Sequence, residues 1–420
     1  MKMKDSGIEW IGEIPETWEV VPLFYCVNDV NTKNQQLAIK HALKFTYGEI
    51  VDKATYDEDT PANILEKIKN YTVVKKKDII INGLNLAFDF VTQRVGEVKK
   101  DGGITSAYMA IRPNDKVISR YLTYLLKTYD NLKAFHNMGG GVRKILNYKE
   151  LSKQRTLLPT RSEQQQIADF LDRKTTEIDG LIDKINAEID LLERYKHAAI
   201  SNAVTIGIDS NSKLKTSNVD YIPILNSNWR ITKLGYICNK LMRPFNSTDT
   251  ALICSNQGKV IERPDSASGI MVSGDNAMQG IKNGDIAIHG MDTWHGAIAL
   301  SNKNGKITRV VHVCESIEDN RFIVYYLQHL AFQGVYKLIS NGVRGNTSDF
   351  RSWEKVKNIY ISIPESMQEQ ARICDYLDEL TSKIDKNINQ KQQQITQLTE
   401  YKNSLIFEYV TGKKQVKEAN

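Results

Sequence analysis

The feature that most constrains the fold is a long amphipathic stretch that occurs twice, at 162–205 and again at 368–411. The copies are identical at 17 of 44 positions with a constant offset of 206 residues, so an internal duplication is the economical explanation. In both copies, apolar residues recur at seven-residue steps in two rows, which is the pattern of a coiled-coil seam. Neither copy is apolar all round, so each needs a partner for its stripe. We therefore predict two long helices that pair as an antiparallel coiled coil with pseudo-twofold symmetry.

The predicted seam is described by the apolar residues that recur in these rows. They are Leu171, Ile178, Ile182, Ile189 and Leu192 in the first copy, and Leu377, Ile384, Ile388, Ile395 and Leu398 in the second. One row of the second copy is interrupted by Lys391, where the first copy has Ile185. At this position we expect the two helices to stop being equivalent.

The duplication extends into the globular parts that precede the helices. Strand-like runs at 77–82 and 105–111 and a helical run at 119–135 are followed, in the same order, by runs at 284–289, 307–313 and 320–338. The tripeptide Gly-Val-Arg then occurs in both halves, at 141–143 and 342–344. We predict an α+β protein built from two similar mixed α/β domains. Its expected parts are an arm (1–22), a first domain (23–160), a first helix (161–207), a linker without regular structure (208–228), a second domain (229–366), a second helix (367–412) and a tail (413–420).

The composition is that of an ordinary globular protein, with 41% hydrophobic and 25% charged residues and a net charge of +6. Five scattered cysteines form no Cys-x-x-Cys pair, which favours a reducing compartment. The first residues lack the apolar core of a signal peptide, and no apolar run has the length of a membrane span. We expect a soluble cytoplasmic protein.

Motifs for catalysis are missing from the sequence. The three Gly-Lys pairs are followed by Val, Ile or Lys rather than the Ser or Thr of a phosphate-binding loop. No Gly-x-Gly turn follows a strand in the way that a dinucleotide or methyl-donor site requires. The segment 289–296 contains His289, Asp292 and His295, but its spacing is not that of a helical zinc site. A polar recognition loop, a metal site and an ordinary packed turn all remain open for it.

Clusters of cationic and polar residues around the predicted strands and the Gly-Val-Arg loops favour nucleic-acid binding. In the first half the candidates are Lys75, Lys76, Arg94, Lys99, Lys100, Arg143, Lys144 and Lys149. In the second half they are Arg243, His289, Arg309, Arg344, Asn346, Thr347, Ser348 and Arg351. Glycines 139–141 allow backbone to approach a phosphate closely, and an arginine beside them can make forked bonds to phosphate or guanine. The alternatives are that the charges form solvated faces and that Gly-Val-Arg is a structural turn.

These motifs together resemble the specificity subunit of type I restriction-modification systems. The resemblance covers nearly the whole chain and is carried by the opening segment 6–15 with Trp18, by Gly342-Val343-Arg344 before Pro364, and by the start of the first helix. The helix-start residues are Glu163, Gln164, Ile167, Asp169, Leu171 and Asp172. The resemblance implies a non-catalytic subunit with two target recognition domains, each of which reads one half of a bipartite DNA sequence. The paired helices would then act as a spacer and as the docking platform for other subunits.

The resemblance also implies the partners and where the chemistry occurs. Two modification subunits would carry S-adenosylmethionine and methylate adenine, and restriction subunits would use ATP and Mg²⁺ to translocate and cleave double-stranded DNA in defence against phage. This chain would bind no cofactor or metal itself. Two other readings remain: a coiled-coil scaffold that organises other proteins, and a cryptic nuclease or methyltransferase.

Overall fold

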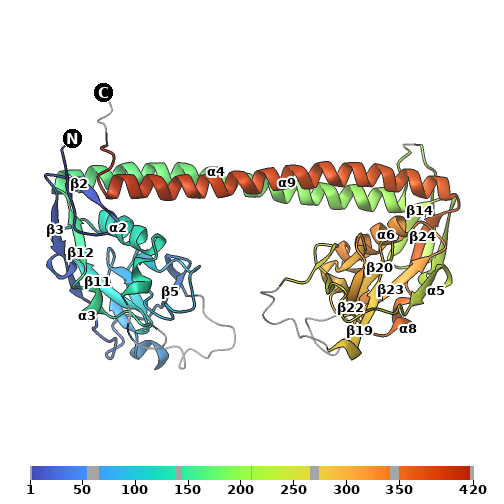
Figure 1. The fold of residues 1–420 in the computed structure, drawn as a ribbon, viewed down its shortest axis with the longest axis horizontal. Helices are drawn as coiled ribbons and strands as arrows, with labels where there is room; N and C mark the ends of the chain where they lie inside the picture. The colour runs from blue at the N-terminus through green and yellow to red at the C-terminus, as the bar shows by residue number, and fades with distance from the viewer. Residues whose placement is uncertain are drawn as a thin grey trace. The chain divides into compact units, whose positions relative to one another are not determined.

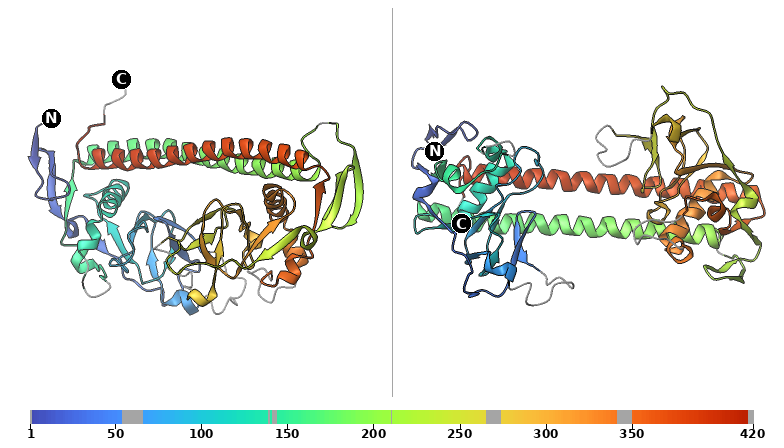
Figure 2. Two further views of the ribbon diagram at one scale, coloured as in Figure 1. Left: turned by 45° about the vertical axis from the view of Figure 1, so that its right-hand side comes forward. Right: turned by 90° about the horizontal axis from the view of Figure 1, so that it is seen from below.

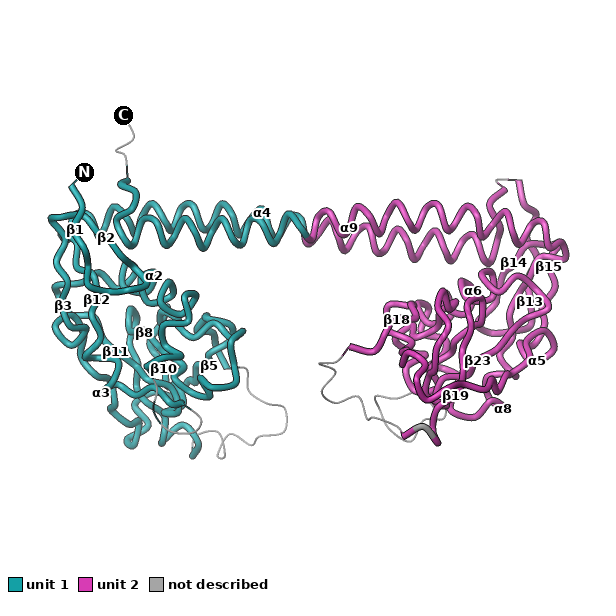
Figure 3. The backbone as a smooth tube through the Cα atoms, in the orientation of Figure 1, with its two compact units in different colours: residues 1–185, 393–420 teal, residues 186–392 magenta. Residues whose placement is uncertain are grey.

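The computed structural model describes residues 2–53, 66–138, 140, 144–209, 211–264, 274–340 and 350–416. It divides into two compact units, unit 1 (Met1–Ile185 with Gln393–Asn420) and unit 2 (Asn186–Gln392). The division passes through the middle of both long helices, α4 (Arg161–Thr205) and α9 (Met367–Val410), so that each unit holds part of each helix (Figure 3).

Unit 1 is built on a four-stranded antiparallel sheet in the order β4-β11-β8-β9. Ile79, Ile80 and Ile81 of its strand β8 are fully buried, because Ile79 and Ile81 face helix α2 while Ile80 faces a second, smaller core. The elements of this unit before α4 are β1 (Met3–Asp5), β2 (Glu13–Pro15), β3 (Glu19–Pro22), η1 (Leu23–Tyr25), β4 (Val27–Asp29), β5 (Leu43–Thr46), β6 (Glu49–Asp52), β7 (Thr72–Val74), β8 (Ile79–Ile81), β9 (Val95–Glu97), β10 (Gly102–Ile104), β11 (Met109–Pro113), α2 (Ser119–Asn131), η2 (Ala134–Asn137), α3 (Tyr148–Leu151) and β12 (Arg155–Leu158).

Unit 2 repeats this arrangement with a sheet in the order β16-β23-β20-β21. Strand β20 has the same two-sided burial, with Ile286 and Ile288 in one core and Ala287 in the other. Its elements between α4 and α9 are β13 (Leu214–Val219), β14 (Ile222–Asn226), β15 (Trp229–Lys233), α5 (Leu234–Ile237), β16 (Cys238–Leu241), β17 (Leu252–Cys254), β18 (Val260–Glu262), η3 (Asp275–Ala277), β19 (Met278–Ile281), β20 (Ile286–His289), η4 (Thr293–His295), β21 (Ile298–Leu300), β22 (Gly305–Thr308), β23 (Val311–Ser316), α6 (Asn320–Phe332), α7 (Val335–Ile339), α8 (Trp353–Val356) and β24 (Tyr360–Pro364). The predicted fold class, two similar α/β domains with long helices, is confirmed.

The start of α4 is fixed by hydrogen bonds that explain the repeated Glu-Gln pair. Thr160 and Glu163 form a capping box, in which the Glu163 N–H donates to the Thr160 hydroxyl at 3.3 Å and the carboxylate accepts from the Thr160 N–H at 3.0 Å. The indole of Trp18 donates to Glu163 at 3.2 Å, and the Gln164 side chain accepts from the Ile118 N–H at 2.7 Å. These bonds join the arm, the sheet domain and the helix.

The tryptophan and glutamine bonds recur at the start of α9. The indole of Trp229 donates to Glu369 at 2.9 Å, and Gln370 accepts from the Asp319 N–H at 3.0 Å. About two turns further on, Tyr325 donates to Asp378 at 2.7 Å, which repeats the bond from Tyr124 to Asp172. The residues shared by the two helix copies therefore attach each domain to its helix.

The two helices lie side by side and antiparallel within each unit (Figures 1 and 2). In unit 1, Lys402 of α9 donates to Asp179 of α4 at 2.6 Å. In unit 2, Lys196 of α4 donates to Asp385 of α9 at 3.0 Å. Because Asp179 and Asp385 are equivalent in the repeat, as are Lys196 and Lys402, one interhelical contact forms twice with the roles of the helices exchanged. This confirms the predicted antiparallel pairing.

Burial along the helices follows the predicted rows. Leu171 and Leu377 are fully buried, Ile178 and Ile384 are nearly so, and the remaining seam residues are half-buried. Lys391 is also half-buried, and its ammonium group forms an ion pair with Glu188 of α4. A lysine can occupy this seam position because its stem lies along the helix surface while its charge reaches the edge.

The structure differs from the sequence prediction in the linker. Residues 214–226 form an antiparallel hairpin, β13–β14, where we expected no regular structure. Its burial pattern is mostly exposed on β13, so the strand lacks the alternation that marks a half-buried strand in a sequence. The predicted strand at 105–111 is also shifted, because the strand β11 begins only at Met109. Among the described residues, no helix combines the length and the apolar character needed to cross a membrane.

Candidate nucleic-acid interface

The predicted lysines of unit 1 lie on the surface next to the sheet. Lys75 and Lys76 form the turn before β8, with their backbone N–H groups held by Asp78 at 2.7 Å and Asp101 at 2.7 Å. Both side chains are exposed. Lys99 pairs with Glu49 at 2.6 Å, and Lys100 pairs with Asp52. Because these pairs are solvent-exposed, they are weak, and a polyanion can compete for the ammonium groups.

The prediction that Arg94 contacts DNA is wrong for this conformation, because its side chain is completely buried. The guanidinium group donates to the backbone carbonyls of Asn82 at 3.1 Å, Leu84 at 2.8 Å and Asp89 at 2.6 Å. These three carbonyls belong to the loop between β8 and β9. Arg94 is therefore the internal anchor of this loop, which we call the β8–β9 loop (residues 82–94).

The β8–β9 loop presents apolar side chains that the sequence analysis missed. Phe88, Phe90 and Val91 are 74%, 55% and 90% exposed. Between them, Asp89 turns inward, and its carboxylate accepts from the N–H groups of Val91 at 3.1 Å and Thr92 at 3.0 Å. Hydrogen bonds from Thr92 lower the pKa of Asp89 to about 2. The signal in the sequence was an apolar run, Phe-Asp-Phe-Val, placed between turn-forming residues where no strand or helix was expected.

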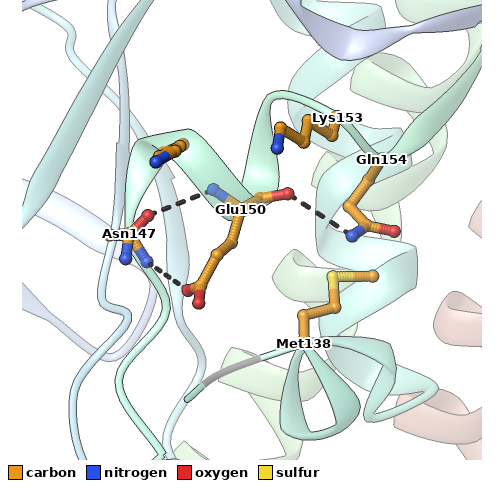
Figure 4. Close-up of a pocket in the computed structure, with 6 residues that line it drawn as sticks. Met138, Asn147, Glu150, Lys153 and Gln154 are labelled. Atoms are coloured by element: carbon orange, nitrogen blue, oxygen red, sulfur yellow. Dashed lines mark hydrogen bonds between the residues drawn. The ribbon is translucent and has the colours of Figure 1, made fainter.

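Lys144 lies beside this loop, and Lys149 follows on the same segment, which leads into β12. Lys144 donates to the carbonyl of His136 at 3.2 Å, and its own carbonyl accepts from the Leu86 N–H of the β8–β9 loop at 3.1 Å. Lys149 and Lys153 line an open pocket of about 480 Å³ (Figure 4). In that pocket, the capping box of Asn147 and Glu150 orders the short helix α3. The two ammonium groups thus stand on an ordered support.

In unit 2, Arg243 has a structural role. Its guanidinium group makes two bonds of 2.8 Å to the carboxylate of Asp285, and this hydrogen bonding raises the pKa of Arg243. Asp285 is nearly fully buried, so breaking the pair would leave a buried charge. Because the forked face of Arg243 is already occupied by Asp285, we do not propose Arg243 as a DNA contact. Arg309 is exposed, and its Nε donates to the Met278 carbonyl at 3.1 Å.

His289 lies at the end of β20 and is largely buried. Its Nδ1 is 3.1 Å from the N–H of Asp292, and burial lowers the pKa of the imidazole, so the ring is neutral and accepts this bond at neutral pH. Gly290 follows at a place where a Cβ would lie 2.9 Å from the Arg351 Cα, so only glycine fits. His295 of the same loop is exposed, as is Arg351. Across the described ranges, no group of three or more His, Cys, Asp or Glu residues gathers as metal ligands.

Several predicted contacts lie outside the described residues. These are Arg143, Arg344, Asn346, Thr347 and Ser348. Among the described candidates, Lys144 lies next to the β8–β9 loop, and Arg351 lies next to Gly290, the residue after His289. Lys99 and Lys100 follow β9 and pair with the β5–β6 hairpin.

The loops at equivalent positions in the two units have different chemistry. The β8–β9 loop of unit 1 exposes two phenylalanines and a valine, whereas the β20–β21 loop of unit 2 (residues 290–297) exposes His295. By contrast, the bonds at the helix starts are the same in both units. The two units therefore share their sheets and the contacts that attach each domain to its helix, and they differ in the loops at the ends of the strands.

Comparison with known proteins gives a consistent result. The sequence model described as "Type I restriction modification DNA specificity domain" matches residues 15–191 and 226–397. A curated relative, the MjaVIII specificity subunit of a type I restriction enzyme from Methanocaldococcus jannaschii, is 23% identical over 435 residues, which covers 97% of this chain and 95% of the relative. A second relative from the same organism, the putative type I restriction enzyme MjaX specificity subunit, is 27% identical over 237 residues, which covers 54% of this chain and 53% of the relative.

A solved structure supports the fold. One chain from a study described as "Structural basis underlying complex assembly and conformational transition of the type I R-M system" aligns with a TM-score of 0.67 over 96% of this chain and 99% of that chain, at 14% identity. The family model matches both halves of the chain, and each match includes one domain and part of the helix that follows it. The chain therefore belongs to the family of type I restriction-modification DNA specificity domains.

Proposed function

We propose that the chain reads a bipartite DNA target, with unit 1 contacting one half-site and unit 2 the other. The observation that carries this proposal is the contrast within the repeat: the contacts that attach each domain to its helix occur twice, while the β8–β9 and β20–β21 loops differ. Two half-sites of different sequence require different DNA-contacting loops, whereas a shared scaffold requires the same contacts between domain and helix in both halves. As a DNA specificity subunit, the chain directs a type I complex and is itself non-catalytic.

The exposed cations supply the sequence-independent part of binding. Lys75, Lys76, Lys144 and Lys149 serve as phosphate contacts in unit 1, since each ammonium group extends from an ordered turn or short helix. In unit 2, Arg309, Arg351 and the predicted residues of the Gly-Val-Arg loop have this role or read bases. The buried His289 stabilises its loop, and the exposed His295 is the histidine that contacts DNA.

The partners are the other subunits of a type I system. The family has no catalytic cofactor site of its own, so S-adenosylmethionine belongs to two modification subunits, and ATP and Mg²⁺ belong to the restriction subunits. The seam residues pair the two helices, and Leu171, Ile178, Leu377 and Ile384 are buried inside the units. Docking therefore falls to the outer faces of the helices. Tyr195 and Tyr401 stand there at equivalent positions, 54% and 56% exposed.

The helices set the spacer between the half-sites. Each long helix has about 45 residues, which corresponds to roughly 67 Å at 1.5 Å per residue, or about two turns of DNA. Because the helices are antiparallel, a seven-residue insertion in each at matched positions preserves the seam and lengthens the spacer without changing either half-site.

The deciding experiment maps modified bases across the genomes of cells that express the modification subunits either with or without this chain. We expect one bipartite adenine motif that disappears without the chain. In the variant with matched insertions, the same two half-sites should be separated by a longer spacer. A motif that persists without the chain would overturn the proposal and favour a scaffold role. Methylation or cleavage by the isolated chain would instead identify it as an enzyme.

A further inference from the structure

We propose that Phe88 of the β8–β9 loop, flanked by Val91, inserts as an apolar wedge at a base step of the half-site that unit 1 reads. The proposal rests on the proposed function, because it names how one of the two half-sites is contacted. By this proposal, unit 1 recognises DNA partly through how easily the duplex is deformed. The equivalent described loop of unit 2 has no apolar residue that is comparably exposed.

The first observation is the exposure of three large apolar residues within four positions. Phe88, Phe90 and Val91 are more than half exposed, although apolar residues of this size are normally buried. Single exposed apolar residues are common, but a contiguous group on one loop indicates a binding surface. Phe90 is partly covered, since its ring stacks on His136 with 4.6 Å between centroids and 17° between planes. Phe88 and Val91 have the larger exposed fractions and form the tip.

The second observation is that the loop is held rigidly from below. The buried Arg94 guanidinium binds three of its carbonyls, and Leu86, at the base of the loop, is fully buried. His136 adds a fourth contact to the loop backbone, with its Nε2 3.0 Å from the Asp89 carbonyl. A loop with these internal bonds does not collapse to bury Phe88, so little conformational entropy is lost when the tip is covered. Proteins that bend DNA frequently insert an apolar side chain such as phenylalanine between base steps, and the Phe88 side chain is held in position to do this.

The third observation identifies DNA as the occupant. A surface that docks two copies of one protein partner should recur at the equivalent place in unit 2, as the Tyr195 and Tyr401 positions do. The β20–β21 loop has no exposed phenylalanine, so the apolar tip is specific to one half. The base of the loop is also joined to a segment that carries a cation, because the Leu86 N–H donates to the backbone carbonyl of Lys144, whose side chain is exposed. A wedge beside a phosphate-binding lysine matches the chemistry of a DNA groove.

The test uses the full chain assembled with its modification subunits and a duplex that carries the mapped target. The fluorescent base 2-aminopurine is placed in turn at each step of the unit 1 half-site, apart from the adenine that is methylated. The parent complex should show a rise in fluorescence at one step, which reports loss of stacking. Phe88→Ala should abolish that rise and weaken binding by about 10- to 100-fold, the range that corresponds to one lost stacking contact. Phe88→Leu keeps an apolar wedge and should bind within about 3-fold of the parent.

The control variant is Tyr236→Ala, which removes an aromatic side chain that is 77% exposed and lies in unit 2. It should leave the signal and the affinity unchanged. Circular dichroism and assembly with the modification subunits should be normal for Phe88→Ala, since the residue is mostly exposed.

Each other outcome overturns the wedge in a recognisable way. If Phe88→Ala fails to assemble with the modification subunits, the tip is a protein-docking surface. If no step shows a fluorescence rise although binding is weakened, Phe88 packs against a groove wall without insertion. If Phe88→Ala binds the target as the parent does, the wedge is refuted while the proposed function stands. A parent complex without sequence-specific binding refutes the proposed function itself.

Discussion

Replacing Arg94 by methionine should loosen the β8–β9 loop in the free protein. Methionine keeps most of the side-chain length but removes three hydrogen bonds from a charged donor to the carbonyls of Asn82, Leu84 and Asp89. Each such bond contributes about 1.5–3 kcal/mol, and relief from burying the guanidinium charge offsets part of their sum. A net local destabilisation of about 3–5 kcal/mol follows. At 1.4 kcal/mol per factor of ten, amide exchange in the loop should accelerate by about 100-fold or more.

Hydrogen–deuterium exchange of the free chain measures this directly. The informative amides are those of Asn82, which bonds to the Arg94 carbonyl at 2.8 Å, and Leu86, which bonds to the Lys144 carbonyl at 3.1 Å. Lys99→Met is the matched control, because this side chain is 70% exposed and lies just beyond β9. If exchange in Arg94→Met equals that of the parent while DNA binding is lost, the reasoning fails and Arg94 is a DNA contact after all.

Three further predictions follow from particular contacts. Burial lowers the pKa of His329 from 6.5 to about 4. Between these two pH values, the unfolded chain binds the proton more readily than the folded chain does. The stability of unit 2 should therefore fall by up to about 3 kcal/mol as the pH falls through this window. Urea unfolding of His329→Asn should lack this part of the pH dependence, and equal slopes in variant and parent would contradict the assignment. Replacing Lys149 and Lys153 together by alanine should weaken binding of the complex to all DNA sequences alike. The slope of log K against log salt concentration should become smaller by about 2. An effect confined to the target sequence would instead mark the two lysines as base contacts. Lys391→Ile should stabilise the helix pair by about 1 kcal/mol in urea titrations, because it buries an apolar side chain at a seam position. Glu188 is 57% exposed and tolerates the loss of its partner. A loss of stability would show that the ion pair contributes more than burial at the seam.

The helix pair could be predicted from the sequence because its contacts are periodic. Leu171 and Leu377 occupy seam positions that follow from the seven-residue repeat alone, and the fixed offset of 206 residues identifies their equivalents. The repeated Glu-Gln pair was also visible, although only the structure shows that Glu163 binds Trp18. Regular elements with a recurring pattern are read reliably from one sequence.

The loops could not be predicted in the same way. Arg94 and Lys99 look alike in a sequence, since both are cations near a strand, and only the fold of residues 82–89 places carbonyls around the first. Phe88 would ordinarily be assigned to a core, because burial is the usual fate of a phenylalanine. The hairpin β13–β14 was missed because a mostly exposed strand carries no alternation of polar and apolar residues. In each case, the deciding interactions join residues that have no periodic relation.

Unit 1 is completed by the end of the chain, and this has a consequence for biosynthesis. The buried Tyr121 hydroxyl donates to the Val410 carbonyl at 3.2 Å, and Lys413 donates to the Glu13 carbonyl at 2.6 Å. Unit 2, by contrast, is one continuous segment. At a translation rate of about 5–20 residues per second, the ribosome needs roughly 10–40 s to make unit 2 before the final helix segment of unit 1 emerges. During that interval, the part of α4 in unit 1 lacks the α9 segment that packs against it, so the domain translated first is the last to finish folding.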